Sequence, residues 1–136
     1  MRNKAELLEK ICEVLRRERQ VLFAYLFGSF ARNEFRKDSD IDIAVYVKDY
    51  KKLPLNFEQK LSLKIEKRIG REVDIIVIND KPLSILSEIL KHGKVIFSRD
   101  ERERVRFETF MLREIQYYNE VMKVFDEARL KKYGIR

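Results

Sequence analysis

The sequence predicts an α/β fold, a small mixed central sheet flanked by helices and followed by a long C-terminal helix. Helical and strand-like segments alternate over the first 98 residues, and after Asp100 apolar positions recur every three or four residues. A chain of 136 residues can close one core but not two. We therefore expect a single domain over residues 1–136, with a core at about 1–98 and a helical extension at about 99–136.

The first part of the chain is expected to contain a helix and two strands. Residues 4–19 carry apolar side chains at helical spacing, namely Leu7, Leu8, Ile11, Val14 and Leu15. Residues 21–27 are a continuous apolar run that ends at a Gly-Ser pair, which is typical of a strand buried on both faces. Residues 29–35 can form a short helix capped by the serine, and residues 40–47 alternate acidic and apolar side chains before becoming apolar, as a second strand.

The next part is expected to add a helix, a strand, a short helix and a short strand. Over residues 57–69 every fourth residue is apolar, and Gly70 suits the C-terminal cap of this helix. Residues 72–78 read as an apolar strand, residues 83–90 as a short helix and residues 94–97 as a fourth strand.

The C-terminal helix is expected to carry a wide apolar stripe made of Phe107, Met111, Ile115, Tyr118, Met122 and Phe125. For any single residue of this stripe, packing on the core is the favoured interpretation. The helix as a whole is the candidate surface for a partner, with self-association as an equal alternative, because amphipathic area is added by Tyr117, Tyr118 and Tyr133.

Charge and composition narrow the classes of function. The net charge is +7, and residues 48–71 hold eight basic and three acidic residues. This surplus suits an anionic partner, and equally the densely charged surface of a heat-adapted protein. Direct DNA binding is not expected, because no stacking platform or reading helix is recognisable. No apolar run is long enough for a membrane span, so a cytoplasmic protein is expected, with its single cysteine, Cys12, buried as a small apolar residue.

One stretch carries the strongest chemical pattern, a Gly-Ser pair, ten residues, and then Asp-x-Asp. Asp40 and Asp42 are two apart on an expected strand, so their carboxylates lie on one face. Asp74 is the only acidic residue inside the next apolar strand, and neighbouring strands lie about 4.8 Å apart. Three carboxylates with no histidine or cysteine nearby favour two Mg²⁺ or Mn²⁺ ions over zinc.

The Gly-Ser pair is a candidate site for a triphosphate. Gly28 permits a tight turn with a phosphate against the backbone, and the Ser29 hydroxyl can donate to an anion. Arg32, three residues further on the same helix face, could also reach the phosphates.

Each of these features also has a purely structural interpretation. The Gly-Ser pair can be a capped turn, residues 38–42 a solvated acidic loop, and Asp74 the partner of a basic residue on the preceding helix. Their combination in this order favours a site. His92 precedes Gly93 at an expected helix end, where a capping or solvated role is favoured, and no Ser/His or Cys/His triad is expected.

The pattern resembles the polymerase-β-type nucleotidyltransferase superfamily, and the small size resembles its minimal nucleotidyltransferase (MNT) branch. Residues 28–32 and 38–42 match the usual wording of that branch closely. The ending, with residues 93–97 and 112–114, is similar to MntA-like antitoxins that are paired with HEPN ribonuclease toxins. One departure is Asn33, where the family usually carries glycine.

The resemblance implies a nucleotidyltransferase with Mg²⁺ and ATP. Gly28 and Ser29 would bind the nucleotide, Asp40 and Asp42 would hold the metal ions, and Asp74 would complete the site. The implied reaction is transfer of AMP from ATP to a tyrosine of a cognate HEPN toxin, which neutralises it. Alternatives are a nucleotidyltransferase acting on a small molecule or an RNA end, and a non-catalytic antitoxin that acts by occlusion.

Overall fold

The computed structural model describes residues 3–28 and 40–134. In chain order the elements are α1 (Lys4–Arg17), β1 (Val21–Phe27), β2 (Ile41–Val47), the 3-10 helix η1 (Tyr50–Lys52), α3 (Phe57–Ile69), β3 (Val73–Val77), α4 (Leu83–His92), β4 (Lys94–Ser98) and α5 (Glu101–Lys132). The strands expected from the sequence are all present, with ends that differ by at most one residue. The short helix expected at residues 29–35 lies outside the described residues.

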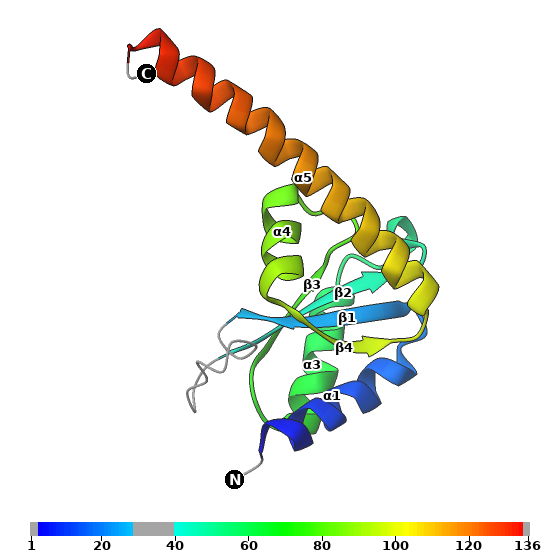
Figure 1. Cartoon of the computed structure of the whole chain (residues 1–136). Helices are drawn as coiled ribbons and strands as arrows, with labels where there is room; N and C mark the ends of the chain where they lie inside the picture. The colour runs from blue at the N-terminus through cyan, green and yellow to red at the C-terminus, as the bar shows by residue number, and fades with distance from the viewer. Residues whose placement is uncertain (1–2, 29–39, 135–136) are drawn as a thin grey trace.

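The four strands form one mixed sheet in the order β3-β2-β1-β4. The central strand β1 is antiparallel to both of its neighbours, whereas β2 and β3 are parallel. Helices α1 and α3 cover one face of the sheet, and α4 and α5 lie on the other (Figure 1). The predicted class, a small mixed sheet flanked by helices with a long C-terminal helix, is confirmed.

Two apolar clusters, one on each face of the sheet, hold the layers together. The larger cluster joins α1 and α3 to the sheet through buried aliphatic side chains, among them Ile11, Leu15, Ile43, Val45, Leu61 and Ile65. The smaller one joins α4 and the start of α5 through Phe23, Tyr25, Ala44, Ile78, Leu86, Ile89 and Phe107. Alternation along β2 follows from this arrangement, because its odd-numbered residues enter the first cluster and its even-numbered residues face the second.

Helix α3 protects the outer edge of β3. Glu58 and Glu66, two turns apart on α3, accept hydrogen bonds from the backbone N–H groups of Val77 and Val73, at 2.8 and 2.9 Å. The same helix forms ion pairs with α1, since Lys64 contacts Glu18 and Arg68 contacts Glu13. Part of the basic surplus of this segment is therefore neutralised within the fold. Gly70 ends the helix with a φ of 71°, as the sequence predicts for a cap.

The base of α5 is fixed to the sheet by a buried phenol. The Tyr25 hydroxyl, at the centre of β1, donates to Glu108 of α5 at 2.9 Å. Arg104 also binds Glu108, at 2.8 Å, so the acceptor carboxylate is itself oriented by a cation. Burial and the Glu108 hydrogen bond raise the pKa of Tyr25 well above its usual range.

The apolar stripe of α5 leaves the core after its third turn. Phe107 is buried and Met111 packs beside it, but Tyr118, Met122 and Phe125 are 53%, 38% and 64% exposed. The expectation that single residues of this stripe pack on the core is therefore wrong for its distal part. The cause is geometric: Tyr118 lies beside the first residues of α4, and α5 then continues past them, where no other described element lies against it (Figure 1).

Two smaller expectations have mixed outcomes. Cys12 is half-buried, and its thiol donates to the carbonyl oxygen of Ile96 in the edge strand β4, so it is not a purely apolar core residue. His92 lies in the last turn of α4, partly exposed and 3.9 Å from Glu88, as expected for a solvated helix end. Within residues 3–28 and 40–134, none of the helices has both the length and the apolarity of a membrane span.

Candidate active site

Two aspartates lie side by side on neighbouring parallel strands. Asp42 is the second residue of β2 and Asp74 is the second residue of β3, and the two are register partners. Side chains at paired positions of a sheet point to the same face. The fold therefore brings these carboxylates together at the end of the sheet where β2 and β3 begin and β1 ends.

The carboxylates lie on the face that α4 and α5 cover. Further along β2, Ala44 and Tyr46 have the same orientation as Asp42 and pack in the cluster beneath these two helices. Their neighbours Ile41 and Ile43 are buried on the opposite face, against α1 and α3. The apolar side chains on one face of β2 thus anchor the strand that carries Asp42 on its other face.

Burial and repulsion raise the pKa of Asp42. The largest cause is loss of solvent around its half-buried carboxylate, followed by the negative charges of Asp74 and then of Asp40. Asp40 precedes β2 and is exposed, as is Asp74. No ion pair between two described residues includes any of these three aspartates. The site therefore accumulates negative charge without a described counter-charge.

A divalent cation fits this donor set chemically. All the side-chain donors of the cluster are carboxylate oxygens, which Mg²⁺ and Mn²⁺ prefer, and a half-buried carboxylate beside a second one is stabilised by a cation. In the part of the chain that the structure describes, however, no three acidic, histidine or cysteine side chains surround one point closely enough to hold a metal ion. Asp42 and Asp74 are thus the two carboxylates that the strands pair, and Asp40 lies close to Asp42 in the sequence.

Gly28 makes room for the carboxylate of Asp42. Its φ is 75°, which side chains other than glycine rarely adopt, and a Cβ atom built on it would lie 2.3 Å from Oδ2 of Asp42. The sequence predicts a tight turn here, but only the fold reveals the close approach to Asp42. The chain that enters the expected phosphate site is therefore packed directly on a carboxylate.

The other expected nucleotide-binding residues, Ser29 and Arg32, lie outside the described residues, as does Asn33, where the sequence departs from the family pattern. They remain predictions of the sequence. Gly28 is the last residue described before this segment, and it adjoins Phe27, the register partner of Asp42.

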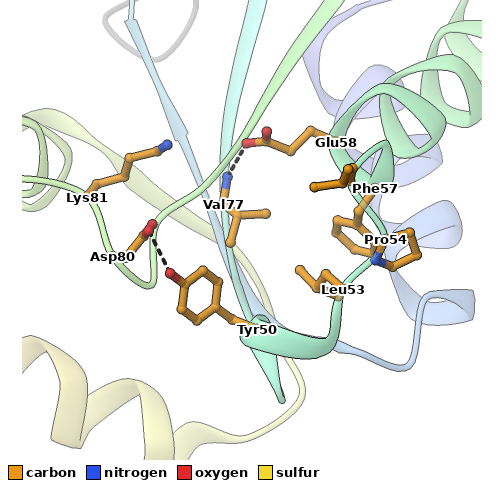
Figure 2. A pocket seen from close by; sticks show the side chains of 9 residues that line it. Tyr50, Leu53, Pro54, Phe57, Glu58, Val77, Asp80 and Lys81 are labelled. Atoms are coloured by element: carbon orange, nitrogen blue, oxygen red, sulfur yellow. Dashed lines mark hydrogen bonds between the residues drawn. The ribbon is translucent and has the colours of Figure 1, made fainter.

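One surface pocket of the described residues lies at the other end of the sheet. It has a volume of about 230 Å³ and is formed by η1, the start of α3 and the residues that follow β3. The Tyr50 hydroxyl donates to Asp80 at 2.6 Å, and the carboxylate of Glu58 accepts from the N–H of Val77; both bonds are dashed in Figure 2. These residues adjoin the ends of β2 and β3, whereas Asp42 and Asp74 lie near their beginnings. The pocket is therefore separate from the carboxylate cluster.

Comparisons with known proteins agree with this geometry. Residues 9–102 match the family model described as polymerase beta, nucleotidyltransferase. Two proteins of Methanocaldococcus jannaschii, both named as putative protein adenylyltransferases, are similar to the chain. The first is 38% identical over 78 residues, which are 57% of this chain and 56% of that protein. The second is 39% identical over 74 residues, which are 54% of this chain and 76% of that protein.

Solved structures share the whole architecture. A chain of a toxin-antitoxin crystal structure with AMP-PNP matches with a TM-score of 0.71 and 22% identity, over 89% of this chain and 97% of that chain. A chain from a complex of a tri-AMPylated Shewanella oneidensis HEPN toxin with an MNT antitoxin matches with a TM-score of 0.69 and 21% identity, over 93% and 98%. At these identities the likeness establishes the fold.

The similarity to the first M. jannaschii protein spans just over half the length of that relative, 56%. The family match is wider, because residues 9–102 contain the whole sheet and all three aspartates. Because this family model covers more than half of the chain, the chain belongs to the polymerase beta nucleotidyltransferase family.

Proposed function

We propose that the protein is a Mg²⁺-dependent adenylyltransferase that transfers AMP from ATP to a tyrosine hydroxyl of a cognate HEPN ribonuclease toxin and thereby neutralises the toxin. The observation that carries the proposal is the pairing of Asp42 with Asp74 on adjacent strands beside Gly28. Such a pair, on the solvent-accessible end of a sheet, suits binding of a metal-complexed triphosphate.

Two similarities favour a protein acceptor over other substrates. The M. jannaschii relatives carry the name of protein adenylyltransferases, and structures of the same fold come from toxin-antitoxin complexes, one with AMP-PNP and one with an AMPylated toxin.

Within this proposal the three aspartates bind the metal ions, and one of them also contacts the acceptor hydroxyl. Asp40, Asp42 and Asp74 would hold the divalent cations, which when bound neutralise triphosphate charge and lower the pKa of the acceptor hydroxyl. Asp42 is the half-buried member, held by β2 and by its contact with Gly28. Asp74 is exposed, so it can meet the incoming hydroxyl, orient it and accept its proton.

The proposed reaction is an in-line displacement. The tyrosine oxygen attacks the α-phosphorus of ATP, and a new O–P bond forms as the bond to the bridging oxygen of the β-phosphate breaks. Pyrophosphate leaves with the bonding electron pair, and the phenolic proton passes to Asp74 or to solvent. Gly28, Ser29 and Arg32 are proposed to bind the triphosphate.

The test combines the purified protein with the protein encoded by the neighbouring gene, tested first for ribonuclease activity, and with Mg²⁺ and each of the four nucleoside triphosphates. Intact-mass spectrometry should detect one or more additions of AMP on the partner with ATP, and peptide mapping should locate them on tyrosine. EDTA should abolish the adduct. The ribonuclease activity of the modified partner should fall in proportion to the adduct.

The alternative functions predict different outcomes. A stable complex without any adduct, with any nucleotide, would favour neutralisation by occlusion. Adducts on RNA ends or on small hydroxylated molecules, and none on the partner, would favour another nucleotidyltransferase activity.

A further inference from the structure

We propose that the acceptor protein docks an amphipathic helix in the groove between α4 and the distal part of α5. This inference rests on the proposed function, because it concerns the protein that receives the AMP group. It commits to a heterologous protein, not to a second copy of this chain, as the occupant.

The groove is a recess of about 320 Å³ where α5 passes α4, lined by Leu83, Ser84 and Ser87 of α4 and by Ile115, Tyr118 and Asn119 of α5. None of the six lining side chains carries a charge. A surface of this kind suits an apolar helix face with small or hydroxylated residues better than a nucleic acid or a free phosphate.

Apolar residues on one face of α5 continue the groove, although other apolar residues of α5, among them Phe110, Leu112, Tyr117 and Val124, are also exposed. Ile115, Tyr118, Met122 and Phe125, here called the groove stripe, succeed one another by three and four residues on the face that includes Phe107 in the core. The same face is therefore covered by the sheet and α4 at its base and is open beyond them. An uncovered stripe with this periodicity is the arrangement by which helices are bound in grooves.

The position of α4 favours the acceptor over a second copy. Leu83 and Ser84, at the start of α4, line the groove, and its end at His92 is followed by Gly93 and Lys94. Lys94 is the register partner of Leu26, the neighbour of Phe27, which pairs with Asp42. Helix α4 thus runs from the groove to the carboxylate end of the sheet.

The separation between groove and site is short on the scale of a protein. Ten residues of α-helix span roughly 15 Å. Both helices lie on the face of the sheet that also carries Asp42 and Asp74, so a protein held in the groove lies on the catalytic side. A protein docked there lies within about one length of α4 from the carboxylates, as an acceptor must. Self-association has no such need for closeness to the site.

Adjacent residues of α5 supply matched variants for the test. Tyr118 belongs to the groove stripe and Tyr117 does not, although they are 53% and 68% exposed. Phe125 belongs to it and Val124 does not, at 64% and 66% exposure. Tyr118→Glu and Phe125→Asp are therefore compared with Tyr117→Glu and Val124→Asp, and circular dichroism checks that each keeps its helix.

Binding is measured by titration calorimetry, without ATP, between the full chain and the protein encoded by the neighbouring gene. The two groove variants should weaken binding by about tenfold or more, and the two matched variants by less than about threefold. In steady-state transfer, the groove variants should raise KM for the acceptor with little change in kcat.

Several results would overturn the inference. Equal effects of both sets, no effect of either, or absence of binding by the unmodified chain would each refute docking at this groove. If the groove variants convert a dimer to a monomer and leave acceptor binding intact, the occupant is a second copy. Groove-dependent binding with no AMP adduct would refute the proposed transfer but not the docking surface.

Discussion

The carboxylates at the two ends of the sheet differ in their surroundings. At the end where β1 finishes, Asp42 and Asp74 lie side by side, and burial, followed by the negative charges of Asp74 and Asp40, raises the pKa of Asp42. At the other end the acidic side chains have protein donors. Asp80 accepts from Tyr50, and Glu103 accepts from Tyr46 at 3.3 Å.

The far end is also closed by side chain to backbone bonds. Asn79 donates to the carbonyl oxygen of Val47 at 2.8 Å and accepts from its N–H at 3.0 Å, which completes the hydrogen bonding at the end of β2. The difference teaches that side-chain hydrogen bonds close one end of the sheet, whereas the other end holds an unfavourable cluster of charges that a ligand could stabilise.

The largest expected effect is a loss of activity at the end of the sheet that carries Asp42 and Asp74. Asp42→Asn should reduce AMP transfer by about 100-fold or more, because it removes a ligand charge from the site. Its melting temperature should stay the same or rise, since a repelled, half-buried carboxylate is replaced by a neutral amide. Rates come from mass spectrometry and stability from thermal denaturation.

Asn79→Ala is the reciprocal test at the far end. The loss of two bonds to the backbone of Val47, which is 2% exposed, should cost about 2 kcal/mol in the free energy of unfolding. Transfer by the folded variant should stay within about twofold of the original. If Asn79→Ala abolished transfer in folded protein, the proposed division between the two ends would be incorrect.

The next largest effect concerns the glycines. Gly28→Ala should reduce transfer by about tenfold or more, since the new methyl group would displace Asp42, and it should cost about 1 kcal/mol or more in stability. Gly70→Ala is the matched control, because its φ of 71° is nearly the same and nothing lies within 4 Å of the added Cβ. It should show a similar backbone cost with unchanged transfer, and equal losses of activity would contradict the assigned role of Gly28.

The smallest effect concerns the attachment of α5. Tyr25→Phe should lower the free energy of unfolding by about 1 to 2 kcal/mol at neutral pH, because the buried bond to Glu108 is lost. The pKa of Tyr25 is raised in the folded state, so its contribution is complete below the ordinary value of 10.0 and is lost as the pH rises above it. Urea midpoints at about pH 8 and about pH 11 should therefore differ less for Tyr25→Phe than for the original protein. An unchanged pH dependence would exclude Tyr25 as a contributor.

Much of the fold could be predicted because local pattern and burial agree. Strands β1 and β3 are apolar runs of strand length between polar turns, and the four-residue spacing in α3 leaves no alternative to an amphipathic helix. For the site, spacing along one strand predicted the shared face of Asp40 and Asp42. The register of Asp42 with Asp74 depends on strand pairing, which no local pattern encodes.

The apolar stripe of α5 shows where such inference ends. Apolar residues recur every three or four positions both in a helix that packs on a core and in one that binds a partner. The sequence therefore could not distinguish Phe107, which is buried, from Phe125, which is exposed. The contact between Gly28 and Asp42 could not be predicted either. It joins two segments that are distant in sequence, and it depends on how closely the folded chain brings them together.

The two glutamates of α3 that bind the edge of β3 have a consequence for how substrates approach. Strand β3 is both the outer strand of the sheet and the carrier of Asp74, and an open edge there would invite an extended peptide to add a fifth strand. Glu58 and Glu66 already occupy the N–H groups of Val77 and Val73. Strand addition at this edge is thereby disfavoured, so a peptide is expected to approach Asp74 across the face of the sheet and not along its edge.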